Sequence, residues 1–196
     1  SAAVGTSTLL ITCLIGIFGG LGVGSGIVIA QIYGSGDMHR LKAAIHNTAA
    51  MIVVSSIFMM LLGYLLTPFY LRLVRTPQEI MGSASGYLRI YFLSFFSVVM
   101  YNFGSGILRA LGDSKSPLYA QIAGGLMNVV MDYLFVHILK DGVNGVAWAT
   151  LISQSVSAVM IFASLRKLDS AYALNVRNIA FDSEILKKMV EVGLPA

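Results

Sequence analysis

The sequence predicts an all-α protein, a polytopic bundle of transmembrane helices. The chain is 57% hydrophobic and only 11% charged, with a mean hydropathy of +0.80, whereas soluble domains carry about 25% charged residues. Five apolar runs are each long enough to cross a bilayer as a helix, which takes about 20 residues. The runs lack the strict alternation of barrel strands, so a transmembrane β-barrel is excluded.

The five predicted spans follow one another with short connections. We expect them at residues 6–32, 43–66, 87–108, 118–139 and 143–165, which together form a transmembrane lobe over residues 1–166. The separators are rich in Gly, Pro, Asp and Lys, which favour turns. Residues 167–196 are predicted to be a cytoplasmic linker, an amphipathic helix and the start of a further span. Asp182 or Ser183 can cap that helix, and Gly193 can end it.

Lys and Arg are distributed unequally between the two sides of the predicted bundle. Nine of the 13 fall on one side and four on the other. Because cytoplasmic loops are enriched in basic residues, the richer side is predicted to be cytoplasmic. The two groups are Arg40, Lys42, Arg109, Lys115, Arg166, Lys167, Arg177, Lys187 and Lys188, and Arg72, Arg75, Arg89 and Lys140.

Asp132 is the only acidic residue well inside a predicted span. A carboxylate at the centre of a membrane helix costs at least about 2.5–3.5 kcal/mol. Protonation, a bound cation or a basic partner can relieve this cost. Alternatively, Asp132 lies near the outer end of its span and reaches water or Lys140. We favour a functional role, since polar residues recur on the same helical face at steps of three and four: Gln121, Gly124, Gly125 and Asn128.

The neighbouring spans offer further polar groups. They are Tyr101, Asn102 and Ser105 before the acidic span, and Asn144, Thr150, Ser153, Gln154 and Ser157 after it. Hydrogen bonds between helices are the preferred interpretation for Ser153 and Ser157. For Asn102 and Thr150, periodicity alone leaves structural and functional roles open.

Several functional classes find no support in these residues. No acids or histidines share metal-ligand spacing inside a span, and no nucleophile has a base beside it, so an enzyme is not predicted. The basic residues lie between apolar runs, so topology explains the net charge of +4 and no nucleic-acid partner is expected. We expect no cofactor. The lipid bilayer and a small-molecule substrate are the expected partners.

The motifs resemble the multidrug and toxic compound extrusion (MATE) family of transporters. Gln31-Ile-Tyr-Gly-Ser-Gly-Asp37 resembles its first cytoplasmic loop, and Arg109-Ala-Leu-Gly-Asp113 with Ser116-Pro117 resembles its second. Asn128-x-x-x-Asp132-Tyr-x-Phe and Gly142-x-x-Gly145-x-Ala-x-Ala-Thr150 resemble its fifth and sixth helices. The resemblance runs over the whole chain, and the order and spacing of the motifs together make it specific.

The resemblance implies a twelve-helix, two-lobe transporter of which the five spans are helices two to six. It implies a cation-coupled antiporter, driven by Na⁺ or H⁺, that exports amphipathic, often cationic compounds from the bacterial plasma (inner) membrane. Asp132 and Asn128 match the family's cation-site pair, joined by Thr150 if Na⁺ couples. Asn102 and Thr150 match cavity positions, and we expect Gln121, Tyr101 and Gln154 to line the same cavity. The first helix and the C-terminal lobe of such a transporter are implied as partners.

Two other readings remain open. One is a lipid-linked sugar flippase of the same superfamily, whose cavity would carry basic residues for the pyrophosphate. No Lys or Arg lies deep in a predicted span, which favours drug export. The other is a membrane scaffold that transports nothing.

Overall fold

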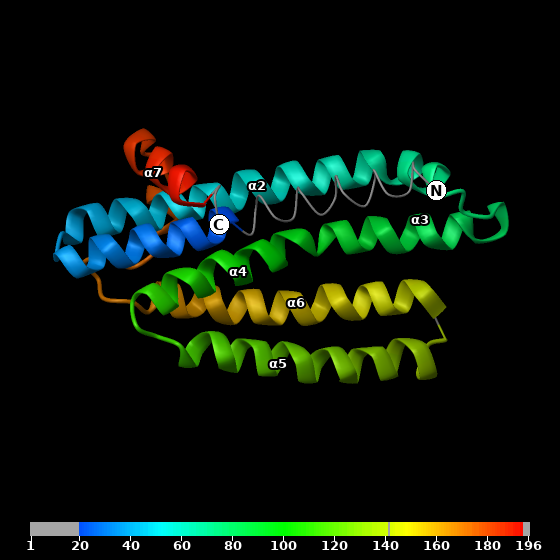
Figure 1. Cartoon of the computed structure of the whole chain (residues 1–196). Coiled ribbons are helices and arrows are strands. Elements are labelled where there is room, and N and C mark those ends of the chain that lie inside the picture. The colour runs from blue at the N-terminus through cyan, green and yellow to red at the C-terminus, as the bar shows by residue number, and fades with distance from the viewer. Residues whose placement is uncertain (1–19, 141, 194–196) are drawn as a thin grey trace.

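The computed structural model describes residues 20–140 and 142–193, and within these residues the regular elements are all helices (Figure 1). A helix over residues 20–35 precedes α2 (Met38–Leu73), α3 (Gln78–Leu93) and α4 (Phe95–Ala110). α5 (Lys115–Asp132) continues into a π-helix, η1 (Tyr133–Ile138), and α6 (Gly142–Arg166) returns beside it. A single 3₁₀ turn, η2 (Val176–Asn178), and α7 (Ser183–Gly193) follow. This architecture confirms the predicted all-α class.

Four helical segments in the described residues are long and apolar enough to cross a membrane: Met38–Leu73, Gln78–Ala110, Lys115–Ile138 and Val143–Arg166. Two of them extend well beyond the predicted spans. α2 runs from Met38 to Leu73 where the span 43–66 was expected, and α3 begins at Gln78, before the expected start at residue 87. Hydropathy locates the bilayer core, whereas caps and prolines set where a helix ends. Of the first predicted span, residues 6–19 lie outside the described part.

Two turns at the same end of the bundle are built alike. Gly36 and Gly112 have φ angles of 77° and 88°, a left-handed conformation that glycine adopts without steric cost. Each is followed by an aspartate that caps the next helix. Asp37 Oδ1 accepts a hydrogen bond from Arg40 N at 2.9 Å, and Asp113 Oδ1 accepts from Lys115 N and Ser116 N at 3.0 Å each. We call this end, which carries the nine-residue basic group, the basic end.

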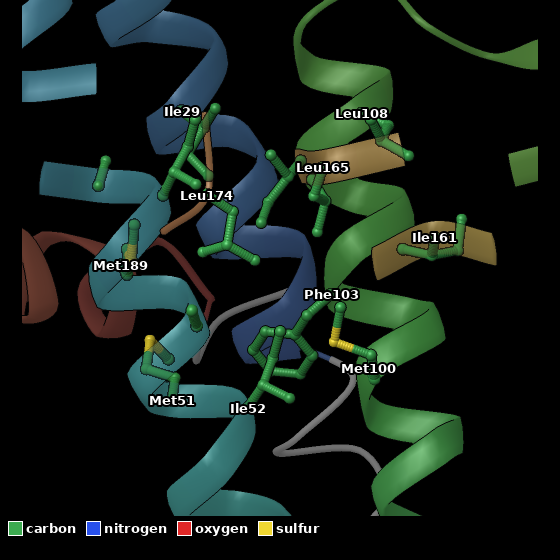
Figure 2. Close-up of a cluster of buried hydrophobic side chains, with 14 of the residues drawn as sticks. Ile29, Met51, Ile52, Met100, Phe103, Leu108, Ile161, Leu165, Leu174 and Met189 are labelled. Atoms are coloured by element: carbon green, nitrogen blue, oxygen red, sulfur yellow. The ribbon is translucent and has the colours of Figure 1, made fainter. Parts of the chain in front are cut away.

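The hydrophobic core lies towards the basic end, where the helix over residues 20–35, α2, α4 and α6 meet (Figure 2). Ile29, Phe103 and Ile161 come from three of these helices and are almost completely buried. Leu174 from the segment after α6 and Met189 from α7 enter the same cluster. The basic end is therefore packed as one unit that includes the chain beyond the last span.

α7 buries its apolar face against protein. Met189 is fully buried and Ile185 is 4% exposed. Close to Met189, the backbones of Gly20 and Gly24 approach Gly193 so tightly that a Cβ atom on either glycine would collide with it. Small residues on the helix over residues 20–35 allow this close approach of α7.

The Asp113 cap yields a prediction about stability. Hydrogen bonds from Ser116, through its side chain and then its backbone N–H, lower the pKa of Asp113 below its ordinary value. The stabilisation is therefore present above the pKa of an unfolded aspartate and is lost as the pH falls through the lowered folded value. Asp113→Ala should destabilise the protein by about 1 kcal/mol, the usual effect of removing a cap. Thermal unfolding of the detergent-purified protein measures it.

Asp113→Asn is the matched control for that experiment. Its amide oxygen can still accept the two backbone hydrogen bonds, so most of the stability should remain and its acid dependence should be weaker. Wild-type stability of the alanine variant would show that the cap contributes nothing.

Candidate functional site

α6 packs antiparallel along α5 (Figure 1). Polar residues of α5 meet α6, as the hydrogen bond from Asn128 to Ser153 shows. The two helices approach closely at Gly124. A Cβ atom there would collide with the Ser157 hydroxyl and lie 3.1 Å from the backbone oxygen of Ser153. Only a residue without a side chain permits this approach of two helix backbones. Gly124 therefore sets the separation of α5 and α6 at the level of the polar face.

Two hydrogen bonds fix the register of this helix pair. Ser157 Oγ donates to the backbone oxygen of Ala120 at 2.8 Å, and Asn128 Nδ2 donates to Ser153 Oγ at 3.4 Å. The structural role preferred for the two serines thus agrees with their contacts. As a result, Asn128 lies level with the middle of α6.

A cavity of about 390 Å³ opens between α4, α5 and α6. It gathers six of the seven site residues expected from the sequence, and Asp132 is the exception. Tyr101 OH donates to Gln121 Oε1 at 3.2 Å or to the backbone oxygen of Pro117 at 3.3 Å, which links α4 to α5. The lining comprises Val98, Tyr101, Asn102, Gln121, Gly124, Gly125, Asn128, Thr150, Ser153, Gln154 and Ser157.

Two polar side chains of this cavity keep oxygen acceptors available beside their own hydrogen bonds. Asn102 Nδ2 donates to the backbone oxygen of Val98 at 2.8 Å, and Thr150 Oγ1 donates to that of Val146 at 3.0 Å. The Thr150 hydroxyl proton and one of the two Asn102 amide hydrogens are thus used within their own helices, while the Asn102 side-chain oxygen and the lone pairs of Thr150 stay available. Such neutral oxygens suit a hydrated or partly dehydrated cation.

Asp132 lies one helical turn beyond Asn128, on the same face of α5, where the cavity lining has already ended. The side chain is half-buried. Its Oδ1 atom is buried and finds no hydrogen-bond partner among the described residues. Neither ion pair in this part of the chain includes Asp132, so no basic side chain here balances its charge. The described residues thus leave one buried carboxylate oxygen of Asp132 without a hydrogen bond.

The chain changes its helical form directly after Asp132. The π-helix η1 begins at Tyr133, and Leu139 N donates to the backbone oxygen of Leu134 five residues earlier, at 2.9 Å. π-Helices are rare and often mark functional sites. This element was not predicted from the sequence, because apolar periodicity does not distinguish a π-helix from an α-helix over six residues.

The roles of other residues near the site were predicted incompletely from the sequence. Ser153 and Ser157 line the cavity in addition to joining the helices. Their positions could have been found from the recurrence of Thr150, Ser153, Gln154 and Ser157 on one helical face. Ser105 is fully buried in α4 and its hydroxyl has no partner in the described residues, but it does not line the cavity.

Charged groups are scarce at the candidate site. Among the described residues there is no cluster of three or more His, Cys, Asp or Glu side chains. The cavity is lined by neutral side chains, and Asp132 is the acidic residue of α5 that lies next to it in the chain.

Comparison with known proteins gives consistent results. The family model described as MatE matches residues 2–134. The "Probable multidrug resistance protein YoeA" of Bacillus subtilis (strain 168) is 31% identical over 204 residues, covering 100% of this chain and 44% of that protein. Among solved structures, "Crystal structure of MATE in the bent conformation" has a TM-score of 0.85 at 30% identity, covering 99% of this chain and 44% of that one.

A second solved structure, an inward-facing conformation of a multidrug resistance MATE family transporter, has a TM-score of 0.84 at 29% identity. It covers 95% of this chain and 42% of that chain. The chain thus spans less than half the length of the relatives it matches. The similar proteins are transporters, in agreement with the expectation that the chain is not an enzyme.

The close approach at Gly124 can be tested with a double-mutant cycle. Gly124→Ala should destabilise the protein by about 1–3 kcal/mol, as overpacking usually does. Ser157→Ala should be less harmful in that background than in the wild type, since it removes the colliding hydroxyl. Thermal unfolding of the wild type and the three variants in detergent measures the coupling.

Gly125→Ala provides the control, because nothing lies within 4 Å of the new Cβ atom. It should be neutral, or stabilising by up to about 1 kcal/mol through helix propensity. If Gly124→Ala behaved like Gly125→Ala, the packing assigned to Gly124 would be wrong.

Proposed function

The chain belongs to the MatE family, and on that premise we propose that it forms part of a cation-coupled antiporter that exports amphipathic, often cationic compounds. It is an integral multi-pass membrane protein. The plasma membrane of a bacterium is the expected location, since the relative YoeA is a Bacillus subtilis protein. Because the chain spans less than half of its relatives, the remainder of such a transporter, including a first helix and a second lobe, is part of the proposal.

The observation that carries this proposal is the position of Asp132. Its buried Oδ1 atom lacks a partner in the described residues and lies one turn from Asn128, at the edge of a polar cavity. When the carboxylate is exposed to one side of the membrane it can take up a cation, and when that cation is displaced the charge can be balanced by a cationic substrate. The cation and the substrate compete for one negative charge, so only one of them binds at a time. This competition is the physical basis of exchange.

Both Na⁺ and H⁺ remain candidates for the coupling ion. The side-chain oxygens of Asn128 and Thr150, together with the Asp132 carboxylate, would form an oxygen site of the kind that hard cations prefer. A proton needs only the carboxylate. Coupling to Na⁺ should therefore depend more strongly on Asn128 and Thr150 than coupling to H⁺.

The lipid-linked sugar flippase receives less support. A pyrophosphate group would require basic side chains, and the cavity between α4, α5 and α6 is lined by no Lys or Arg. A scaffold without transport would have no use for an unpartnered carboxylate in a membrane helix. Drug export therefore accounts for more of the site than either alternative.

Asp132→Asn in the full-length protein should abolish coupled export while leaving a folded, inserted protein. The substitution is nearly isosteric and removes the charge that must be balanced. Asn128→Ala should weaken transport less if H⁺ couples, and more strongly if Na⁺ couples. Dye efflux from cells under imposed Na⁺ or pH gradients, with expression checked by immunoblot, measures these effects.

Asp169→Asn is the control, since it removes a carboxylate from the turn after α6 and leaves the cavity unchanged. It should export at the wild-type rate. Undiminished efflux by Asp132→Asn under both gradients would reduce Asp132 to a structural residue and remove the proposed mechanism.

A further inference from the structure

The segment between α6 and α7 is held against α2 by side chains instead of crossing freely to the next helix. We call residues 167–182 the strap. Leu174 in its middle is 6% exposed and belongs to the hydrophobic core (Figure 2). After this buried residue, the strap donates two backbone N–H groups to adjacent residues of α2. Asn175 N donates to His46 Nε2 at 3.1 Å, and Asp182 N donates to Asn47 Oδ1 at 3.1 Å.

The hydrogen bonds of His46 determine its protonation state. Its ring is 3% exposed, and Nδ1 lies 2.7 Å from the backbone oxygen of Lys42. A carbonyl oxygen can only accept, so Nδ1 carries a proton. A backbone N–H can only donate, so Nε2 carries none. His46 is thus the neutral Nδ1–H tautomer while the strap is attached.

A second proton on His46 is incompatible with this attachment. It would occupy Nε2 and point at the N–H of Asn175, so that two donors would face each other. The imidazolium would keep its bond to Lys42, and the strap would lose its acceptor at Asn175. Histidine is the side chain that ordinarily changes charge between about pH 5 and pH 8.

Asn47 supplies a neighbouring attachment that does not titrate. Besides accepting from Asp182, it contacts Met189 Sδ of α7 through Nδ2 at 3.6 Å. α7 is held further by the ion pair of Arg40 with Glu184, at 2.6 Å. Loss of the His46 bond therefore removes the attachment at Asn175, while the attachment at Asp182 and the position of α7 are kept.

The charged groups around His46 come from α2 and from the strap. A cavity of about 300 Å³ beside it is lined by His39 and Lys42 of α2 and by Asp182 of the strap. Arg177, two residues after Asn175, is exposed. His39 is the second imidazole at this cavity, so its effect must be separated from that of His46.

We infer that the strap is a pH-sensitive tether, attached to α2 by neutral His46 and released at Asn175 when His46 is protonated. Acidification of the basic end would then loosen the segment that leads out of the bundle. The inference rests on described contacts at that end and does not depend on the proposed function of Asp132.

Hydrogen exchange at single-amide resolution tests the tether in the full-length protein. Exchange of the Asn175 and Asp182 amides is compared at about pH 8 and about pH 5.5, after correction for the intrinsic effect of pH. Protection of Asn175 should fall at the lower pH by roughly fivefold to tenfold, the factor implied by the net loss of one hydrogen bond. Protection of Asp182, whose acceptor does not titrate, should change less.

Two variants identify the titrating group. His46→Gln offers an amide oxygen in place of Nε2, so Asn175 should remain protected at both pH values. His39→Gln should keep the wild-type pH dependence. The tether is refuted if wild-type Asn175 is equally protected at both pH values, if the dependence persists in His46→Gln, or if His39→Gln removes it. The wild-type comparison of Asn175 with Asp182 decides the matter even if a variant fails to fold.

Discussion

The structure depends on one constraint: in a bilayer, a polar group must find its hydrogen-bond partner within the protein. The hydroxyl groups along α2 show how this is met. Thr48, Ser55, Ser56 and Thr67 each donate to the backbone oxygen four residues earlier in the same helix. Because these hydroxyl groups are satisfied locally, they need no partner on a neighbouring helix. In much of the described bundle, hydroxyl groups likewise bond to the backbone of their own helix.

α5 departs from this pattern. Its polar side chains find partners on α4 and α6, through Tyr101 and Gln121 on one side and Asn128 and Ser153 on the other. Asp132 then remains with a buried oxygen that the described residues do not satisfy. The position of this carboxylate, one turn beyond Asn128 at the edge of the polar cavity, is the arrangement on which the proposed cation site rests.

The fold class and most of the cavity could be predicted from the sequence, because both depend on periodicity within single helices. Tyr101, Asn102, Gln121, Asn128, Thr150 and Gln154 meet in one cavity because each lies on a polar face that only a neighbouring helix can cover. Periodicity carries no information about the contacts that the chain makes beyond a single helix. It gave no indication of the π-helix after Asp132. Nor could it reveal that Asn175 would bind His46, a contact between residues 129 positions apart.

The difference between α2 and α5 also bears on how the protein enters the membrane. By mean hydropathy α2 is the most apolar of the four span-capable segments and the one containing α5 the least. A helix whose hydroxyls are already bonded to its own backbone can leave the translocon for lipid as a single segment. The exposed amides and carboxylate of α5 make the same step costly in isolation. The short turn to α6 brings its partner within reach, so that these two helices are suited to enter the lipid together as a hairpin during synthesis.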